Sequence, residues 1–301
     1  GLVRSIQKGE TIMLNDKSPS TEQSTKALSE YDHTDGRDGL SHPKKSGVDF
    51  SHGIALYLED VSVWFDSFRA LNNLSLYIEE GELRCIIGPN GAGKTTAMRM
   101  LIGVLEPTSG KGEVASYDIF KNSRKLKKHI GYMSQKFSLY DDLTAKENMR
   151  FFGGIYGLTN KEIKNRTKEL LNHFGMEHLE KERVSSLPLG WKQKLAFCTA
   201  LMHKPDVVFL DEPTSGVDPA IRRQFWEMIY ETAEGGVTVL VTTHNMDEAE
   251  YCHRISMMVA GKMIKVDTPQ NLKNEYKLQT MGEVFLHLAR GYEKKHAITE
   301  S

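Results

Sequence analysis

The sequence has few cysteines, almost no net charge and no long uncharged apolar stretch. The three cysteines among its 301 residues, Cys85, Cys198 and Cys252, lie far apart and without the close spacing of metal ligands, as is typical of a reducing compartment. The formal net charge of −1 gives no electrostatic reason to expect binding to nucleic acid or anionic lipid. No apolar run approaches the roughly 20 residues of a membrane span, and no secretory signal is apparent. We therefore expect a soluble, cytosolic enzyme, which could move a solute only through a path formed by another polypeptide.

A complete phosphate-binding sequence follows a short apolar run. Residues 88–95 match the pattern GxxxxGK[ST] in full, directly after the apolar residues 83–87. This order predicts a strand, a glycine-rich turn whose backbone N–H groups surround phosphates, and a helix whose N-terminus faces the same anion. The lysine supplies a positive charge and the Thr95 hydroxyl can hold Mg²⁺, whereas a glycine-rich turn with a chance lysine would lack this strand–helix context. We predict a nucleoside triphosphate site formed by Gly88, Pro89, Asn90, Gly91, Ala92, Gly93, Lys94, Thr95 and Thr96.

Two carboxylates at the end of a second apolar run predict hydrolysis of that nucleotide. Residues 207–210 have the composition of a buried strand, and Asp211 and Glu212 follow them directly. Asp211 can reach Mg²⁺, directly or through water, and Glu212 can orient or deprotonate a water aimed at the γ-phosphate. Phosphoryl transfer depends mainly on positioning and charge neutralisation, so a metal, a lysine and a water-orienting carboxylate meet most of its requirements. An isolated acidic pair at a strand end is usually only solvated, but downstream of a phosphate loop we interpret this pair as catalytic.

Three more segments complete an ordered set. Gln135 follows Gly-Tyr-Met-Ser, Asp218 ends Ser-Gly-Val-Asp, and His244 follows the apolar run 237–242. In this order the set resembles the ATP-binding subunit of ABC transporters, over residues 54 to about 290. Each residue alone is a weak signal, because an isolated histidine is usually a satisfied surface or core residue. The residues taken together, in this order, are a specific signal for this family.

The resemblance implies a role for each of these side chains. Gln135 would contact Mg²⁺ or the attacking water and report to a membrane partner, and His244 would contact the γ-phosphate. Asp218 would lie at the seam between two ATPase subunits. Phe65 would stack on adenine in place of the more usual tyrosine, although it could instead be a core residue. The catalytic set is then Glu212, His244, Gln135 and Lys94, and the metal-binding set is Thr95, Gln135 and Asp211.

The resemblance also implies an architecture, a reaction and partners. The expected fold is α/β, a P-loop NTPase core with a mostly parallel sheet, a small antiparallel β subdomain and an inserted helical subdomain. The protein would hydrolyse ATP with Mg²⁺ as the motor of an ABC transporter and drive solute export through a separate membrane-spanning subunit. A second ATPase subunit would complete a homodimer or heterodimer, and nucleic acid is not expected as a partner. The chain would be cytoplasmic and peripheral on the inner face of the cell membrane.

Composition divides the chain into three parts. Residues 1–53 are rich in Ser, Asp, Lys and Gly and have few aromatics, which predicts a disordered or non-native tail. The first residue is Gly1 and not methionine, which suggests a fragment or a processed chain. The ATPase domain is predicted over 54–290, with a helical lobe at about 136–204, and a polar C-terminal tail over 291–301.

Periodicity and turn residues predict the elements in more detail. Strands are expected at 55–58, 61–65, 74–78, 207–210 and 237–242, and helices at 97–105 and about 221–232. Residues 143–201 are predicted to be mainly helical, with breaks at Gly153-Gly154, Gly157, Gly175 and 187–190. The alternation of strands and helices predicts a largely parallel sheet with helices on both faces.

Segment 187–191 departs from the signature sequence of the ABC transporter family, LSGGQ, whose second residue is a serine. The family's serine supplies a hydroxyl donor to the nucleotide bound by the opposite subunit, whereas Pro188 supplies neither a hydroxyl nor an N–H. One interpretation is a Pro-Gly turn before a helix whose N-terminal backbone donors still hold phosphate. Another is an asymmetric pair, in which this chain's catalytic residues act opposite a partner with an intact signature. Where the family reads LSGGQ, this chain has Leu187, Pro188, Leu189, Gly190 and Trp191.

Two stretches of the chain resemble different branches of the family. Residues 55–96, particularly 81–88, look like the ATP-binding subunit of urea or branched-chain amino-acid importers. Residues 97–290 resemble the export branch (ABC-2, multidrug-type), most clearly at 105–110 and 215–219. A chimeric chain joined inside the phosphate loop would account for this, and divergence within one branch is the alternative. Transport direction should follow the export-like part, because the segments that face the membrane partner lie downstream of the join.

Three other functions remain as alternatives. The chain could be the ATPase subunit of a urea or branched-chain amino-acid importer. It could be a low-turnover nucleotide-binding partner in an asymmetric pair, which Pro188 and Trp191 favour and Glu212 and His244 oppose. It could also be a soluble ABC ATPase acting on ribosomes or DNA, but ribosomal forms usually carry two cassettes and a charged linker and DNA-repair forms a long coiled coil. This sequence shows neither feature.

Overall fold

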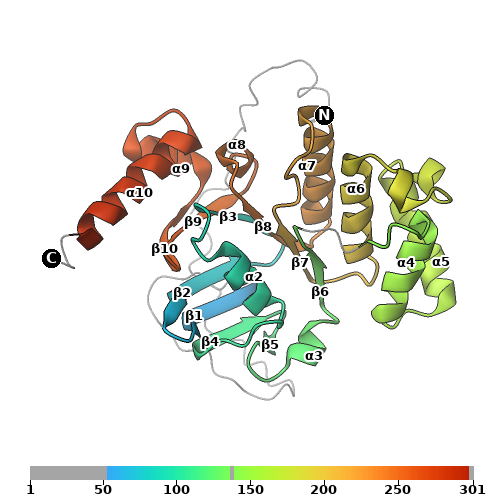
Figure 1. The fold of residues 1–301 in the computed structure, drawn as a ribbon, viewed down its shortest axis with the longest axis horizontal. Helices are drawn as coiled ribbons and strands as arrows, with labels where there is room; N and C mark the ends of the chain where they lie inside the picture. Colours follow the sequence, from blue (N-terminus) through green and yellow to red (C-terminus); the bar gives the residue numbers. More distant parts are fainter. Residues whose placement is uncertain (1–52, 136–138, 298–301) are drawn as a thin grey trace, which may run out of the picture. The chain divides into compact units, whose positions relative to one another are not determined.

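The computed structural model describes residues 53–135 and 139–297. Two sheets and the helices around them make up this part of the chain (Figure 1). The prediction of a disordered or non-native tail over 1–53 lies outside the described residues, except for Gly53. Within the described ranges, no helix is long and apolar enough to cross a membrane.

The larger sheet is six-stranded and carries the phosphate loop. All neighbouring strands are parallel except β9 and β10, which form an antiparallel pair. Every residue of β3, β7 and β8 is buried, as expected for parallel strands covered on both faces. The predicted mostly parallel sheet is therefore confirmed. Its order is β10 (Lys262–Asp267), β9 (Arg254–Val259), β3 (Leu83–Ile87), β8 (Thr238–Thr243), β7 (Val207–Asp211) and β6 (Ile130–Met133).

The smaller sheet is antiparallel and has the strand order β2-β1-β4-β5. Strand β1 runs unbroken over Ile54–Phe65, so the prediction of two strands at 55–58 and 61–65 is wrong. Asp60 has a φ of 50°, and the register shifts locally on either side of it, which bends the strand without ending its pairing with β2. The other strands are β2 (Phe68–Glu79), β4 (Ser109–Val114) and β5 (Tyr117–Asp118).

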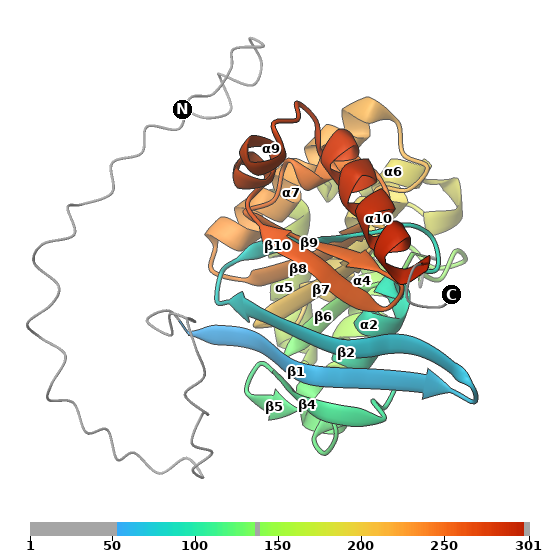
Figure 2. The same ribbon diagram turned by 90° about the vertical axis from the view of Figure 1, so that its left-hand side faces the viewer.

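The side chains of β3 alternate between two hydrophobic cores. Cys85 and Ile87 belong to the core shared with helices α6 (Leu189–Ala200) and α7 (Pro219–Glu234). Ile86 belongs to the core that also holds residues of the antiparallel sheet and of α2 (Lys94–Leu101). Both views show α2 beside β2 (Figure 1 and Figure 2). Strand β3 therefore links the two cores through side chains on its opposite faces.

Threonine N-caps fix the start of two helices in the helical part of the chain. Helix α4 (Ala145–Ile155) begins after Thr144 and α5 (Asn160–His173) after Thr159. Each threonine forms a capping box with the glutamate three residues later, Glu147 or Glu162, so two backbone N–H groups are satisfied at each start. Helix α4 contacts both α5 and α6, and Figure 1 shows the three side by side.

The predicted helix break at Gly153-Gly154 is wrong. Helix α4 continues through both residues to Ile155. A Cβ on Gly153 would lie only 2.8 Å from Cγ1 of Ile163 on α5, so glycine permits close packing of the two helices at this point. The breaks at Gly157 and Gly175 are confirmed, with φ values of 82° and 67°.

Two further boundaries differ from the sequence-based expectation. Helix α2 ends at Leu101, before the expected 105, and Gly103 has a φ of 67°. Helix α10 (Met281–Ala297) continues across the predicted boundary between 290 and 291. The remaining helices are α3 (Ser123–Leu126), α8 (Met246–Ala249), α9 (Pro269–Tyr276) and the 3₁₀ turns Glu177–Leu179 and Val184–Ser186.

We predict that Gly190→Ala lowers the free energy of unfolding by about 1–3 kcal/mol. A Cβ on Gly190, at the start of α6, would lie 2.3 Å from Cγ2 of Ile221 on α7. The helices would have to separate, or Ile221 would have to leave its rotamer. Equilibrium unfolding in urea measures the change. Gly154→Ala is the matched control, since nothing lies within 4 Å of a Cβ there, and it should leave stability unchanged or raise it. Equal stability of Gly190→Ala and wild type would contradict this contact.

Candidate active site

The phosphate loop lies between β3 and α2 and depends on glycine at two positions. Gly91 and Gly93 have φ values of 80° and 102°, in the left-handed region that L side chains rarely adopt. A Cβ on Gly93 would also lie 2.8 Å from the backbone oxygen of Ala70. The Ala97 N–H donates to the Gly93 oxygen at 2.8 Å, so α2 begins inside the loop. The predicted order of strand, glycine turn and helix is confirmed.

Lys94 is buried, and its ammonium group folds back over the loop. Its Nζ donates to the backbone oxygens of Gly88 at 2.6 Å and Pro89 at 3.1 Å. Burial lowers the pKa of Lys94, and the negative charges of Glu212 and Asp211 oppose that shift. A phosphate in the loop would oppose it further. The ammonium group is therefore placed to compensate the charge of a bound nucleotide.

Asp211 is a buried carboxylate at the end of β7. It pairs in the ladder with Thr242 of β8, and its Oδ1 accepts a hydrogen bond from Thr242 Oγ1 at 2.6 Å. Burial raises the pKa of Asp211, while hydrogen bonds from the hydroxyls of Thr242 and Thr95 lower it in part. The protein therefore holds this carboxylate where its negative charge is unfavourable.

The oxygen atoms around Asp211 suit a magnesium ion. The Thr95 hydroxyl and the Asp211 carboxylate lie within hydrogen-bond reach of each other, and hard oxygen ligands are those that Mg²⁺ prefers. In the part of the chain that the structure describes, no group of three or more His, Cys, Asp or Glu side chains could hold a metal ion. The Gln135 amide oxygen, phosphate oxygens and water could supply the other ligands, as expected for an ion that arrives with its nucleotide.

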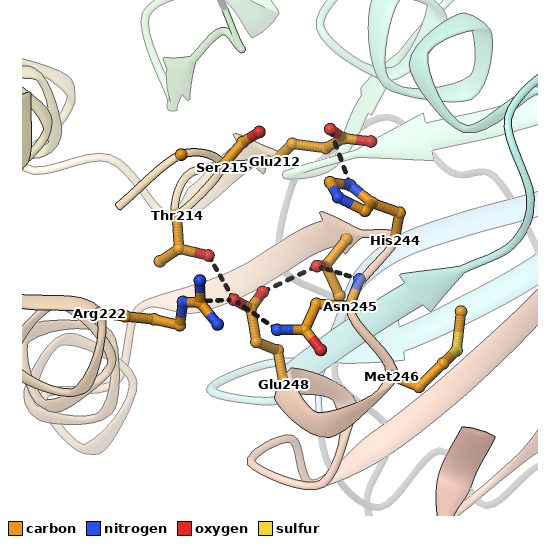
Figure 3. Close-up of a pocket in the computed structure, with 10 residues that line it drawn as sticks. Glu212, Thr214, Ser215, Arg222, His244, Asn245, Met246 and Glu248 are labelled. Atoms are coloured by element: carbon orange, nitrogen blue, oxygen red, sulfur yellow. Dashed lines mark hydrogen bonds and ion pairs between the residues drawn. The ribbon is translucent and has the colours of Figure 1, made fainter. Parts of the chain in front are cut away.

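Glu212 is held in an unusual backbone conformation beside Asp211. Its φ is 49°, a left-handed value that costs a residue with a side chain roughly 1–3 kcal/mol. Its N–H donates to the Thr242 backbone oxygen at 3.0 Å, which helps to fix that conformation. Glu212 Oε2 accepts a hydrogen bond from Gln135 Nε2 at 2.9 Å. The same oxygen lies 3.1 Å from His244 Nδ1, a contact drawn in Figure 3. The structure therefore brings together three residues that lie far apart in the sequence.

Phe65 lies at the surface, at the end of β1. Its side chain is 47% exposed, so the alternative of a core residue is excluded. Trp64 and Phe68 beside it are also exposed. Stacking of Phe65 on adenine stays a prediction.

Segment 187–191 forms the start of α6. Pro188 is the N-cap residue, and its carbonyl oxygen accepts from the N–H of Trp191 at 3.0 Å. The Trp191 ring packs under the buried ammonium group of Lys194, 4.6 Å from the ring centroid, with His178 at its edge. Among the described residues, no hydrogen bond or ion pair joins this segment to the phosphate loop of the same chain.

Asp218 has a structural role that sequence reasoning missed. Its Oδ1 accepts from the N–H groups of Ala220 and Ile221, both at 3.1 Å, so it caps the N-terminus of α7. Pro219 occupies the first turn of that helix. The Asp-Pro pair was a visible helix-start signal. Asp218 remains exposed, as a residue at a subunit seam would be.

A cavity of about 330 Å³ opens beside Glu212 and His244 (Figure 3). Arg222 and Glu248 line it together with short segments that follow β7 and β8. Neither residue, nor Thr242, was singled out from the sequence. Glu248 lies on the short helix α8 that follows His244, but only the fold shows that this carboxylate is buried.

The geometry defines a P-loop nucleotide-binding protein, and sequence comparison narrows that class. A family model described as "ABC transporter" matches residues 71–215. The probable multidrug ABC transporter ATP-binding protein YbhF of Escherichia coli (strain K12) is 45% identical over 238 residues, which cover 77% of this chain and 41% of the relative. The linearmycin resistance ATP-binding protein LnrL of Bacillus subtilis (strain 168) is 37% identical over 218 residues, which cover 72% of this chain and 70% of the relative. The chain spans about two fifths of the length of the first of these relatives.

Solved structures agree with the sequence relatives. The structure of an ATP-binding subunit of an ABC transporter superposes with a TM-score of 0.70 at 26% identity and covers 78% of this chain and 99% of its own. A dimeric ATP-binding cassette in a post-hydrolysis state, bound to ADP and Pi, superposes with a TM-score of 0.64 at 26% identity and covers 71% and 98%. The chain belongs to the ABC transporter family, among its ATP-binding proteins.

We predict that Asp211→Asn stabilises the nucleotide-free protein at pH 7 by about 0.5–2 kcal/mol. The pKa of Asp211 is raised above its ordinary value of 3.8, so the folded state binds this proton more tightly than the unfolded state. Ionisation of Asp211 therefore lowers stability as pH rises through the folded-state pKa. The gain from asparagine should be full at pH 7 and should shrink as pH falls towards 4.

Urea unfolding at several pH values measures this difference. Asp142→Asn, on an exposed side chain, is the matched control and should change little. A loss of stability in Asp211→Asn at pH 7 would show that the Thr242 hydrogen bond outweighs the desolvation of the carboxylate.

Proposed function

We propose that this chain hydrolyses ATP as the motor of an ABC transporter and drives solute export through a separate membrane subunit. The observation that carries the proposal is the position of Glu212, held between Gln135 and His244 and within electrostatic reach of Lys94. Relatives named as multidrug and linearmycin-resistance ATP-binding proteins support export.

Each residue around the phosphate loop has an assigned task in this reaction. Lys94 and the backbone N–H groups of the loop hold the phosphates, and Thr95, Asp211 and Gln135 are the candidate ligands of Mg²⁺. Bound Mg²⁺ would neutralise charge on the phosphates during transfer. Glu212 orients the attacking water and accepts its proton.

The contacts of Glu212 with Gln135 and His244 bear on this assignment. One oxygen, Oε2, lies within reach of both Gln135 Nε2 and His244 Nδ1. When water and nucleotide enter, these two side chains have to share or release that oxygen. His244 would then turn its ring to the γ-phosphate, and Gln135 would turn to the metal or the water.

An exposed apolar patch supports a membrane-spanning partner. Tyr140, Phe151 and Ile155 are 48%, 40% and 62% exposed, and the rings of Tyr140 and Phe151 lie 4.6 Å apart. Exposed apolar patches of this kind mark protein–protein contacts. The patch lies on α4 and at Tyr140, which is five residues after Gln135 in the sequence, so a bound subunit could act on the site through this glutamine. Such a complex would hold the chain at the cytoplasmic, inner face of the cell membrane.

A second ATPase subunit would complete the site. Asp218 and segment 187–191 make no polar contact with their own phosphate loop in the described structure, and a related cassette is dimeric. Pro188 offers no side-chain hydrogen bond at the start of α6, which supports an asymmetric pair with a weak second site or low turnover. The adenine ring would lie against Phe65.

The domain limits and the chain's origin are part of the proposal. We place the ATPase domain at 54–290, with its helical lobe at about 136–204 and a polar tail after it. The importer function and the chimeric join in the phosphate loop stay predictions. The 238-residue match to the E. coli relative is longer than the chain after Thr96, which favours divergence within the export branch.

Glu212→Gln should keep ATP affinity and lower kcat by about 10²–10³-fold, because glutamine keeps the shape of the side chain but cannot accept the proton of the water. Lys94→Ala should instead weaken ATP binding by at least about tenfold, since it removes a charged phosphate contact. Phosphate release and a fluorescent ATP analogue measure the two effects. Glu234→Gln, on an exposed glutamate, is the control and should be neutral. Full ATPase activity of Lys94→Ala would refute the assignment of this loop.

In the Glu212→Gln background with Mg-ATP, Pro188→Ser should lower the concentration for dimerisation by at least about tenfold. The serine hydroxyl would add a hydrogen bond to a charged phosphate across the seam, worth roughly 1.5–3 kcal/mol. Light scattering measures the solution mass. Pro188→Ala also removes the ring but adds no hydroxyl, so it should not reproduce the gain. If proline and serine variants dimerised alike, the backbone donors of α6 would suffice and the asymmetric pair would lose its basis.

A further inference from the structure

Glu248 is a buried carboxylate at the centre of the network drawn in Figure 3. Its side chain is only 3% exposed. Oε1 accepts a hydrogen bond from Thr214 Oγ1 at 2.7 Å, and Oε2 accepts one from Thr243 Oγ1 at 2.7 Å. Arg222 Nε lies 3.4 Å from Oε1, and Asn245 Nδ2 lies 3.5 Å from it. Because a buried carboxylate is costly unless it is paired, these donors hold Glu248 in place, and Glu248 in turn holds them.

The two threonines belong to the two segments that carry the catalytic side chains. Thr214 lies two residues after Glu212, and Thr243 directly precedes His244. One carboxylate therefore ties the segment that carries Glu212 to the segment that carries His244. The distance of 3.1 Å between Glu212 Oε2 and His244 Nδ1 spans those same segments.

The pairing of β7 with β8 does not reach Thr214 or Thr243. The pairing of β7 with β8 ends at Asp211 and Thr242. Past that pair the chain turns away at Glu212, whose φ is 49°. Thr214 and Thr243 lie beyond this β7–β8 pairing, and the Glu248 carboxylate connects them there, in addition to the hydrogen bond from the Glu212 N–H to the Thr242 oxygen.

Arg222 extends the connection to α7. Its guanidinium group faces Glu248 and also donates to the backbone oxygen of Val217 at 3.1 Å. Val217 directly precedes Asp218, the N-cap of α7. The same carboxylate therefore reaches the segment expected at the subunit seam.

We infer that Glu248 is a positioning residue, which sets the geometry of the Glu212–His244 pair by bridging Thr214 and Thr243. This inference rests on the proposed ATP hydrolysis and adds a specific residue to it. Glu248 itself touches neither the phosphate loop nor the reacting atoms. Its removal should therefore change the chemical step and leave nucleotide binding intact.

Glu248→Gln tests this role with a side chain of the same shape. The amide keeps one acceptor oxygen but places an N–H₂ group where a threonine hydroxyl now donates or where the Arg222 guanidinium group now forms an ion pair. We expect kcat for ATP to fall at least about tenfold, with ATP affinity unchanged within about twofold. Glu250→Gln is the matched control. That glutamate lies two residues away, is exposed and pairs with Lys273 at 3.1 Å, so wild-type kinetics are expected.

Two substitutions at Thr214 distinguish a positioning role from an effect on general stability. Thr214→Val keeps the shape of the buried side chain and removes its hydroxyl, whereas Thr214→Ser keeps the hydroxyl and removes a methyl group. Positioning through Glu248 predicts a loss of kcat in the valine variant and rescue by serine. Equal losses in both variants would mean that only packing matters at this site. These variants also serve if Glu248→Gln fails to fold.

A spectroscopic readout makes the test independent of turnover. In the full chain with ¹⁵N-labelled histidine, the ring signals of His244, assigned with His244→Gln, should shift in Glu248→Gln as the contact with Glu212 loosens. The ring signals of His178, packed against Trp191, should not. If the wild-type chain shows no ATPase activity but Glu248→Gln still shifts the His244 signals, hydrolysis by the chain alone is refuted and the positioning role is supported. Unchanged His244 signals, or an unchanged kcat in an active protein, would overturn the inference.

Discussion

Parallel pairing of β3, β8 and β7 is the constraint on which the rest of the structure depends. Parallel strands end at the same edge of a sheet, and these three strands are buried along their whole length. Burial of their apolar side chains fixes the register, in which Ile87 faces Thr243 and Asp211 faces Thr242. The phosphate loop, the acidic pair and His244 therefore meet at one edge of the sheet. More than a hundred residues separate the phosphate loop from the acidic pair in the sequence.

Burial of the charges at this edge of the sheet costs free energy. Lys94, Asp211 and Glu248 are all buried. Burial lowers the pKa of Lys94 and raises the pKa of Asp211, so it favours the neutral form of each. Glu212 adds a left-handed backbone. A protein keeps such features where they serve a ligand or a reaction. Phosphate and a magnesium ion would supply the opposite charges to Lys94 and Asp211, whereas Glu248 is already matched by its neighbours, as expected of a structural support.

The start of α6 shows how packing can replace a missing side-chain cap. Pro188 cannot cap the helix with a hydroxyl, and the segment is held by other contacts. Gly190 allows close approach to Ile221 on α7, and Lys194 and His178 enclose the Trp191 ring. These contacts within the chain hold the turn in place. In the proposed pair of ATPase subunits, its function would depend on backbone donors and on the partner that it meets.

The sequence by itself determined the phosphate loop, the acidic pair and the parallel core, because glycine spacing and runs of buried residues act locally and leave a local pattern. It also marked Gln135 and His244, through their order along the chain. Only the tertiary structure decided that both side chains meet one oxygen of Glu212, that Gly153-Gly154 continues a helix packed on Ile163, and that Glu248 is buried. These facts arise from contacts between segments distant in the sequence, and a carboxylate in a short helical turn looks the same whether solvent or two threonine hydroxyls surround it.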